Sequence, residues 1–108
     1  MSTGTIVLIP FPFAELTNVK VRPAIVIANT KDKHQDLILC AISSVIPSKL
    51  GMFEMKLFPD SINQLRVPSI IIIDRIATLK RENIITTLGK ISEEEVRTFV
   101  RLFRQLVD

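Results

Sequence analysis

The sequence predicts a small, mainly β domain that ends in one α-helix. Most of the chain consists of short runs of β-branched and other large apolar residues separated by turn signals, a pattern typical of a compact antiparallel barrel or sandwich. The C-terminal segment instead repeats its apolar residues at helical spacing. At 108 residues the chain is long enough for one core and not for two. We therefore expect residues 1–108 to form a single domain.

Five strands are expected. Runs rich in Ile, Val, Leu and Phe favour extended backbone, and they lie at residues 6–9, 24–28, 37–42, 53–57 and 70–73. The run 53–57 alternates strictly between apolar and polar residues, which predicts a half-exposed strand. The run 70–73 does not alternate, which predicts burial on both faces, with a partner subunit as one possible cover.

The C-terminal segment predicts a helix that begins after Ser92. Ser92 can serve as the N-cap, and Glu95, three residues later, completes a capping box. One apolar stripe follows, made of Val96, Phe99, Val100, Phe103, Leu106 and Val107. Burying six such side chains would contribute about 9–18 kcal/mol before the entropic cost of ordering them. The stripe could also bind a partner, but packing on the barrel is the favoured interpretation.

Composition narrows the possible classes of protein without choosing one. The apolar fraction of 47% and the mean hydropathy of +0.36 are high for a soluble chain this short. They predict either a subunit interface or a dense β core. The formal charge of +3 and the isoelectric point near 9.4 permit nucleic-acid binding but do not require it.

The usual signatures of export, membrane insertion, metal binding and cofactor binding are not seen. The N-terminus lacks a signal-peptide pattern and no apolar run approaches the ~18 residues of a membrane span, so we expect a cytoplasmic protein. The lone Cys40 is expected in the core. His34 is the only histidine and the three glycines are widely spaced, which disfavours a metal site and a phosphate loop. The sequence thus favours metal-free and cofactor-free chemistry.

Four segments follow one another in a recognisable order. A strand that starts at Gly4 runs into Pro10-Phe11-Pro12-Phe13, an Arg22-Pro23 pair opens the next strand, and the segments 37–44 and 71–79 come after it. In this order they resemble the MazF/PemK/Kid family of bacterial toxins, which are small endoribonucleases of toxin–antitoxin pairs. The resemblance covers nearly the whole chain. It implies the SH3-like barrel shared by Kid, MazF and CcdB. The apolar excess and the run 70–73 further lead us to expect a homodimer.

Arg22 is the main catalytic candidate. Pro23 fixes its own φ and keeps Arg22 extended where a loop becomes a strand. A guanidinium can bind two phosphoryl oxygens and stays charged, which suits it to a pentacoordinate phosphate. The resemblance implies a catalytic role, because the family's catalytic arginine stands in the matching Arg-Pro motif. The alternative is a surface salt bridge with Glu15 or Asp36.

Ser43 and Asp74 complete the catalytic set that the resemblance implies. Ser43 ends its strand where the family has a hydroxyl facing the pocket, and Asp74 stands where some members have an assisting acid. Each residue could instead belong to an ordinary turn. Kid-like members carry an arginine two residues before that acid, whereas this chain has Ile72. The loop after the first strand also lacks the histidine and glycines of several relatives, so the general base and the level of activity stay open.

RNA binding would need a positive groove and flat surfaces for bases. The candidate substrate-binding residues are Lys20, Lys49 and Arg75 for the groove, Phe11 and Phe13 for stacking, and Ser44 beside Ser43. Phe11 and Phe13 are more readily explained as core or interface residues.

The function implied by the resemblance is metal-independent, sequence-selective cleavage of single-stranded RNA such as mRNA. RNA supplies its own nucleophile in the 2′-OH, and the products would carry a 2′,3′-cyclic phosphate and a 5′-hydroxyl. The expected partners are a cognate antitoxin that lays a disordered segment along the groove, and operator DNA through the toxin–antitoxin complex. Two alternatives are a CcdB-like gyrase-binding toxin and an inactive member that binds only antitoxin or DNA.

Overall fold

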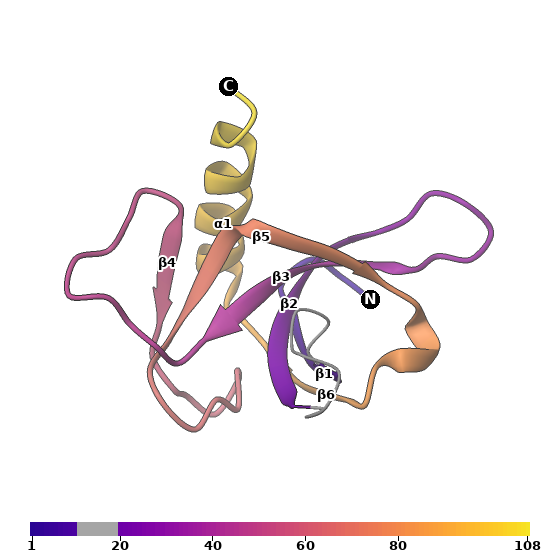
Figure 1. The fold of residues 1–108 in the computed structure, drawn as a ribbon, viewed down its shortest axis with the longest axis horizontal. Helices are drawn as coiled ribbons and strands as arrows, with labels where there is room; N and C mark the ends of the chain where they lie inside the picture. The colour runs from indigo at the N-terminus through magenta and orange to yellow at the C-terminus, as the bar shows by residue number, and fades with distance from the viewer. Residues whose placement is uncertain (11–19) are drawn as a thin grey trace.

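The computed structural model describes residues 1–10 and 20–108, which form one curled sheet with a helix packed against it (Figure 1). Its elements in chain order are β1 (Thr5–Pro10), β2 (Val21–Asn29), β3 (Leu37–Ser43), β4 (Glu54–Leu57), β5 (Ser69–Leu79), the 3₁₀ turn η1 (Arg81–Asn83), β6 (Thr86–Lys90) and α1 (Glu93–Gln105). The predicted fold class, mainly β with a C-terminal helix, is confirmed. No helix in these two ranges is long and apolar enough to cross a membrane.

The strands form a single antiparallel sheet in the order β4-β5-β3-β2-β1-β6, so β4 and β6 are its edges. The segment 58–68, which we call the rim loop, leaves β4 at one edge and reaches β6 at the other. There the Lys90 amide donates a hydrogen bond of 3.1 Å to the Ile62 carbonyl. The rim loop therefore bridges the two edges and holds the sheet in its curled form.

Two clusters of buried side chains stabilise the sheet, one on each face of β1. Ile6 belongs to the cluster beneath the helix, whereas Val7 and Ile9 belong to the other, as the two-residue period of a strand requires. Phe99 of α1 is 1% exposed and inserts into the first cluster.

The helix begins as predicted. The Ser92 hydroxyl accepts a 3.1 Å hydrogen bond from the Glu95 amide, and the Glu95 carboxylate accepts one of 2.9 Å from the Ser92 amide. The predicted burial of Val107 is wrong, because the helix ends at Gln105 and Val107 is 83% exposed. Leu102, which was not assigned to the stripe, packs against the core.

The buried strand is longer than predicted and contains a bulge. Ala41 pairs with Ile72 and Cys40 with Ile76, so residues 73–75 have no partner on β3. Ile70, Ile71 and Ile73 are at most 1% exposed within the single chain, whereas Ile72 is only partly buried. Strand β6 was not predicted, because its Thr-Thr-Leu-Gly-Lys sequence lacks the apolar run that marks the other strands.

Candidate functional site

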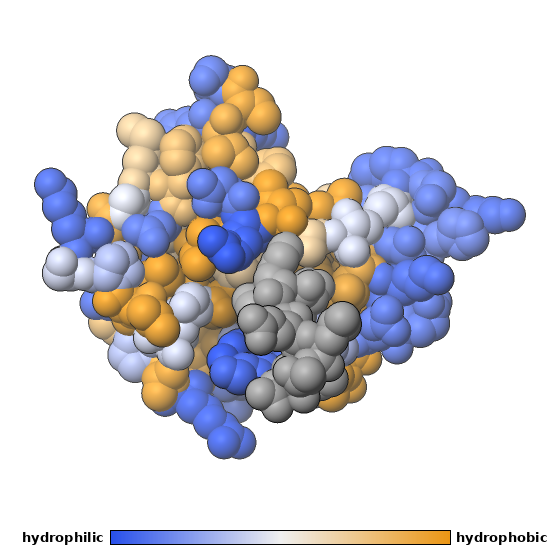
Figure 2. All heavy atoms as spheres, viewed as in Figure 1, coloured by the Kyte–Doolittle hydropathy of each residue, from blue (hydrophilic) through white to orange (hydrophobic). Residues whose placement is uncertain are grey.

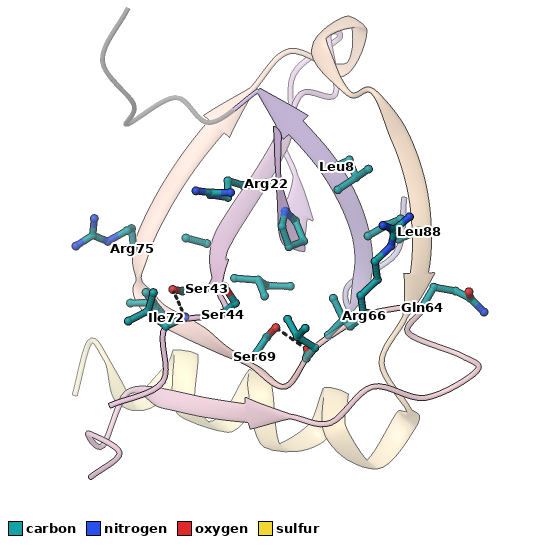
Figure 3. Close-up of a pocket in the computed structure, with 16 residues that line it drawn as sticks. Leu8, Arg22, Ser43, Ser44, Gln64, Arg66, Ser69, Ile72, Arg75 and Leu88 are labelled. Atoms are coloured by element: carbon teal, nitrogen blue, oxygen red, sulfur yellow. Dashed lines mark hydrogen bonds between the residues drawn. The ribbon is translucent and has the colours of Figure 1, made fainter. Parts of the chain in front are cut away.

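A pocket of about 580 Å³ opens between the sheet and the rim loop (Figure 3). Its walls come from β1, β2, β3, β5 and β6 and from residues 64–67 of the rim loop. Most of the lining is apolar, as in pockets that hold organic ligands. Three arginines also line it, Arg22, Arg66 and Arg75, and none of the described lining residues is acidic. The pocket thus combines apolar walls with an excess of positive charge.

Arg22 lies on β2, where it pairs with Ile9 of β1. Pro23 follows it in the strand, is partly buried and also lines the pocket. The ladder fixes the backbone of Arg22, while the side chain is exposed and lies on the β2 side of the cavity (Figure 3). Because the backbone is already fixed, only the side chain has to be ordered when the guanidinium meets a phosphate.

Ser43 ends β3 and is partly buried in the pocket wall. Its hydroxyl oxygen accepts a 3.1 Å hydrogen bond from the Val45 amide, which turns the chain away from the strand. The hydroxyl hydrogen can still be donated to a ligand, because a serine hydroxyl is both donor and acceptor. Ser44 is exposed next to it and also lines the pocket.

Asp74 and Arg75 lie in the bulge of β5. Arg75 contributes to the lining, but its side chain points away from the other labelled side chains, along the outside of the sheet (Figure 3). Asp74 is exposed and is not a lining residue. It lies near the Cys40 thiol: burial, with the Asp74 charge as the smaller cause, raises the pKa of Cys40 to about 12. The bulge therefore separates Asp74 from the cavity that holds Arg22 and Ser43.

The remaining predicted residues fall elsewhere. Lys20 and Lys49 are exposed and do not line the pocket. Phe11 and Phe13 lie outside the described residues.

The rim loop also lines the pocket, through Arg66 and Gln64 above all, and neither residue was predicted as a site residue. No strand or helix pattern marks this segment, so nothing in the sequence relates it to Arg22. The only local signal is Asp60 followed by Asn63, since both residue types favour turns stabilised by side-chain to backbone hydrogen bonds.

Metal ligands are not grouped in the two described ranges: no three His, Cys, Asp or Glu side chains lie together there. The arginines, hydroxyls and apolar walls of the pocket suit an anion with apolar or flat parts.

Comparison with known proteins matches the fold and the family of the chain. Among solved structures, the chain is similar to an endoribonuclease from a mycobacterial species in complex with its cognate antitoxin. The TM-score is 0.74 at 11% sequence identity, over 99% of this chain and 94% of that chain, which shows a shared fold. Curated proteins give no match. The family of PemK-like, MazF-like toxins of type II toxin–antitoxin systems matches residues 2–107, and the chain therefore belongs to this toxin family.

Proposed function

We propose that this toxin is an endoribonuclease that cleaves single-stranded RNA without a metal ion. The observation that carries the proposal is the placement of Arg22 and Ser43 in one pocket whose described lining includes no acidic residue. Such a pocket attracts a phosphodiester and does not repel it. The endoribonuclease activity of the mycobacterial protein with the same fold supports the same conclusion.

RNA needs little from such an enzyme, because it carries its own nucleophile. The 2′-oxygen attacks phosphorus, the P–O5′ bond breaks, and the products are a 2′,3′-cyclic phosphate and a 5′-hydroxyl once the proton of the 2′-OH has been lost and the 5′-oxygen has gained one. Arg22 would stabilise the charge on the pentacoordinate phosphate, and Ser43 would orient a phosphoryl oxygen or the 2′-OH. Asp74 is exposed on the bulge and does not line the pocket, so it would contact another part of the RNA rather than the reacting phosphate.

We further propose that the toxin acts in the cytoplasm as a homodimer silenced by a cognate antitoxin, with operator DNA bound through that complex. Exposed apolar side chains support a protein–protein interface. Before α1, the most exposed of them are Val45, Met52 and Phe58, at 79%, 74% and 63%. In Figure 2 extended hydrophobic areas lie on the visible face, while hydrophilic side chains gather at its right side. Apolar surface of this kind is typical of protein-binding sites. Light scattering should give twice the 12.2 kDa mass of the chain.

The test is incubation of a long, unstructured RNA with the protein in EDTA, followed by chemical analysis of the product ends. The proposal expects cyclic phosphate and 5′-hydroxyl ends, with the same rate after Mg²⁺ is added back. Loss of cleavage in EDTA would contradict the metal-free mechanism. No cleavage in either buffer would favour an inactive or gyrase-binding toxin, a reading that Ile72 in the pocket wall, in place of the arginine of Kid-like members, keeps open.

A further inference from the structure

The rim loop is built around one buried polar side chain. Asn63 is 0% exposed. Its amide oxygen accepts hydrogen bonds from the backbone amides of Asp60 and Leu65, at 3.1 and 3.0 Å, and its amide nitrogen donates one of 2.8 Å to the Phe58 carbonyl. The Asp60 carboxylate in turn accepts from the amides of Ile62 and Asn63, at 2.9 and 2.7 Å. Buried amide bonds of this kind fix a loop in one conformation.

The same loop is seated against the edge strand β6. The Ile62 carbonyl accepts the 3.1 Å bond from the Lys90 amide, and a Cβ atom at Gly89 would overlap that carbonyl oxygen. Gly89 is therefore required for the close approach of the two backbones. Leu88, left unpaired at the register shift between β1 and β6, lines the pocket beside the loop.

These contacts fix the backbone on both sides of Arg66. On one side the Leu65 amide is bonded to Asn63, and on the other the Ser69 hydroxyl donates a 3.0 Å bond to the Val67 carbonyl. The Arg66 side chain lines the pocket and runs towards Leu88, on the side of the cavity away from Arg22 (Figure 3). An exposed arginine on an anchored backbone, facing a cavity with no described acidic lining, is placed for a ligand.

We propose that Arg66 is a second phosphate-binding residue for RNA, and that Asn63 and Gly89 are positioning residues that hold it over the pocket. The inference rests on the proposed function and extends it. Arg22 would meet the reacting phosphate from β2, and Arg66 a neighbouring phosphate from the rim loop. Apolar side chains separate the two cations, which suits a strand whose phosphates alternate with flat bases.

Binding can be measured apart from cleavage with a mixed-sequence, unstructured RNA oligonucleotide that carries 2′-O-methyl groups throughout and so lacks the nucleophile. Arg66→Ala should weaken its binding about tenfold, the effect of losing one charge-assisted hydrogen bond. The slope of log K against log salt should become shallower by about 0.7, because one phosphate contact is lost. Arg66→Lys should keep the slope. Arg104→Ala, on the exposed face of α1, is the matched control and should change neither quantity.

The positioning role has its own readout. Asn63→Ala should make the salt slope shallower although Arg66 is still present. Adding Arg66→Ala to Asn63→Ala should then cost little more, since residues that act as a unit are not additive. Gly89→Ala offers a second route to the same result. If these two variants fail to fold, Arg66→Ala alone decides whether Arg66 binds phosphate.

The outcomes are separable. This inference is overturned if wild type cleaves RNA but Arg66→Ala binds RNA as tightly as Arg104→Ala and with the same salt slope. That result leaves the proposed function intact. Wild type that neither binds nor cleaves RNA overturns both. Polyglutamate serves as a peptide probe: if Arg66→Ala weakens its binding but not that of RNA, the site recognises acidic peptide and the inference is wrong.

Discussion

The two sides of the pocket are built in different ways. On the strand wall, Arg22 and Ser43 are held by backbone ladders; neither side chain packs in the core, and the Ser43 hydroxyl makes only the local bond to the Val45 amide. On the loop wall, the rim loop has no ladder of its own and depends on the buried Asn63 amide. On the strand wall, the residues proposed to act on RNA are thus not those that stabilise the fold. On the loop wall, Asn63 both stabilises the loop and positions its arginine.

This difference has a consequence for mutation. A strand backbone is stabilised by many hydrogen bonds and by both core clusters, so one exposed side chain can be removed without moving its neighbours. A loop with a single buried anchor responds as a unit when that anchor is lost. Four predictions test the contrast, from the largest expected effect to the smallest.

Arg22→Ala should lower RNA turnover by ~10²–10³, equivalent to about 2.7–4 kcal/mol of transition-state stabilisation. Arg22→Lys should recover little, because a point charge cannot reproduce a planar fork. The melting temperature should stay unchanged, since Arg22 is exposed. Cleavage rates and thermal melts of the three proteins are the measurement. A large drop in melting temperature would show that the strand wall does not separate function from stability.

Asn63→Ala should lower the free energy of unfolding by about 1–3 kcal/mol, because buried backbone groups lose their partners. Arg66→Ala, three residues along the same loop but exposed, should leave that free energy unchanged. Urea titration of both variants beside wild type gives the comparison. Equal stability of Asn63→Ala and wild type would mean that the loop wall is not anchored as the hydrogen bonds indicate.

The same contrast explains what could be predicted from the sequence. The strand wall could be predicted because Arg22-Pro23 and the end of the run 37–42 lie on apolar strands. The period of these strands also indicates how they pair. The start of the helix could be predicted because the capping box involves only residues close together in the sequence. The roles of Asn63 and Arg66 could not be predicted. They depend on a contact between residue 62 and β6, which is distant in the sequence.

The bulge behind the strand wall was equally hidden. Whether Asp74 pairs with β3 or lies in a bulge depends on the register between β5 and β3. The sequence alone does not reveal that register. Val107 shows the opposite limit: the apolar residues keep helical spacing past Gln105, but the helix ends there.

A third prediction concerns Cys40, which lies behind the strand wall beside that bulge. Its pKa rises from 9.0 to about 12 in the folded protein. Below pH 9 the thiol is neutral in both states, whereas above it the unfolded chain loses the proton first. The free energy of unfolding should therefore fall by about 1.4 kcal/mol between pH 8 and pH 10 on account of Cys40. The chain has no tyrosine, so no phenol contributes to the change in this pH range.

Urea titrations at pH 8 and pH 10 of wild type and Cys40→Ala isolate this contribution. The variant should show the smaller decline, whatever its absolute stability. Identical declines would show that the thiol ionises without penalty, and hence that the core behind the strand wall opens to water.

The smallest expected effect lies outside both walls, at the start of α1. Ser92→Ala removes the hydroxyl that accepts from the Glu95 amide, and should lower the free energy of unfolding by about 1 kcal/mol. Neither residue lines the pocket, so RNA cleavage at a temperature well below melting should be unchanged. Ser92→Thr, which keeps a capping oxygen, is the matched control and should retain most of the stability. If Ser92→Ala slowed cleavage while the fold stayed intact, the helix would have to communicate with the pocket through the Phe99 core, and stability and function would be joined on the strand wall as well.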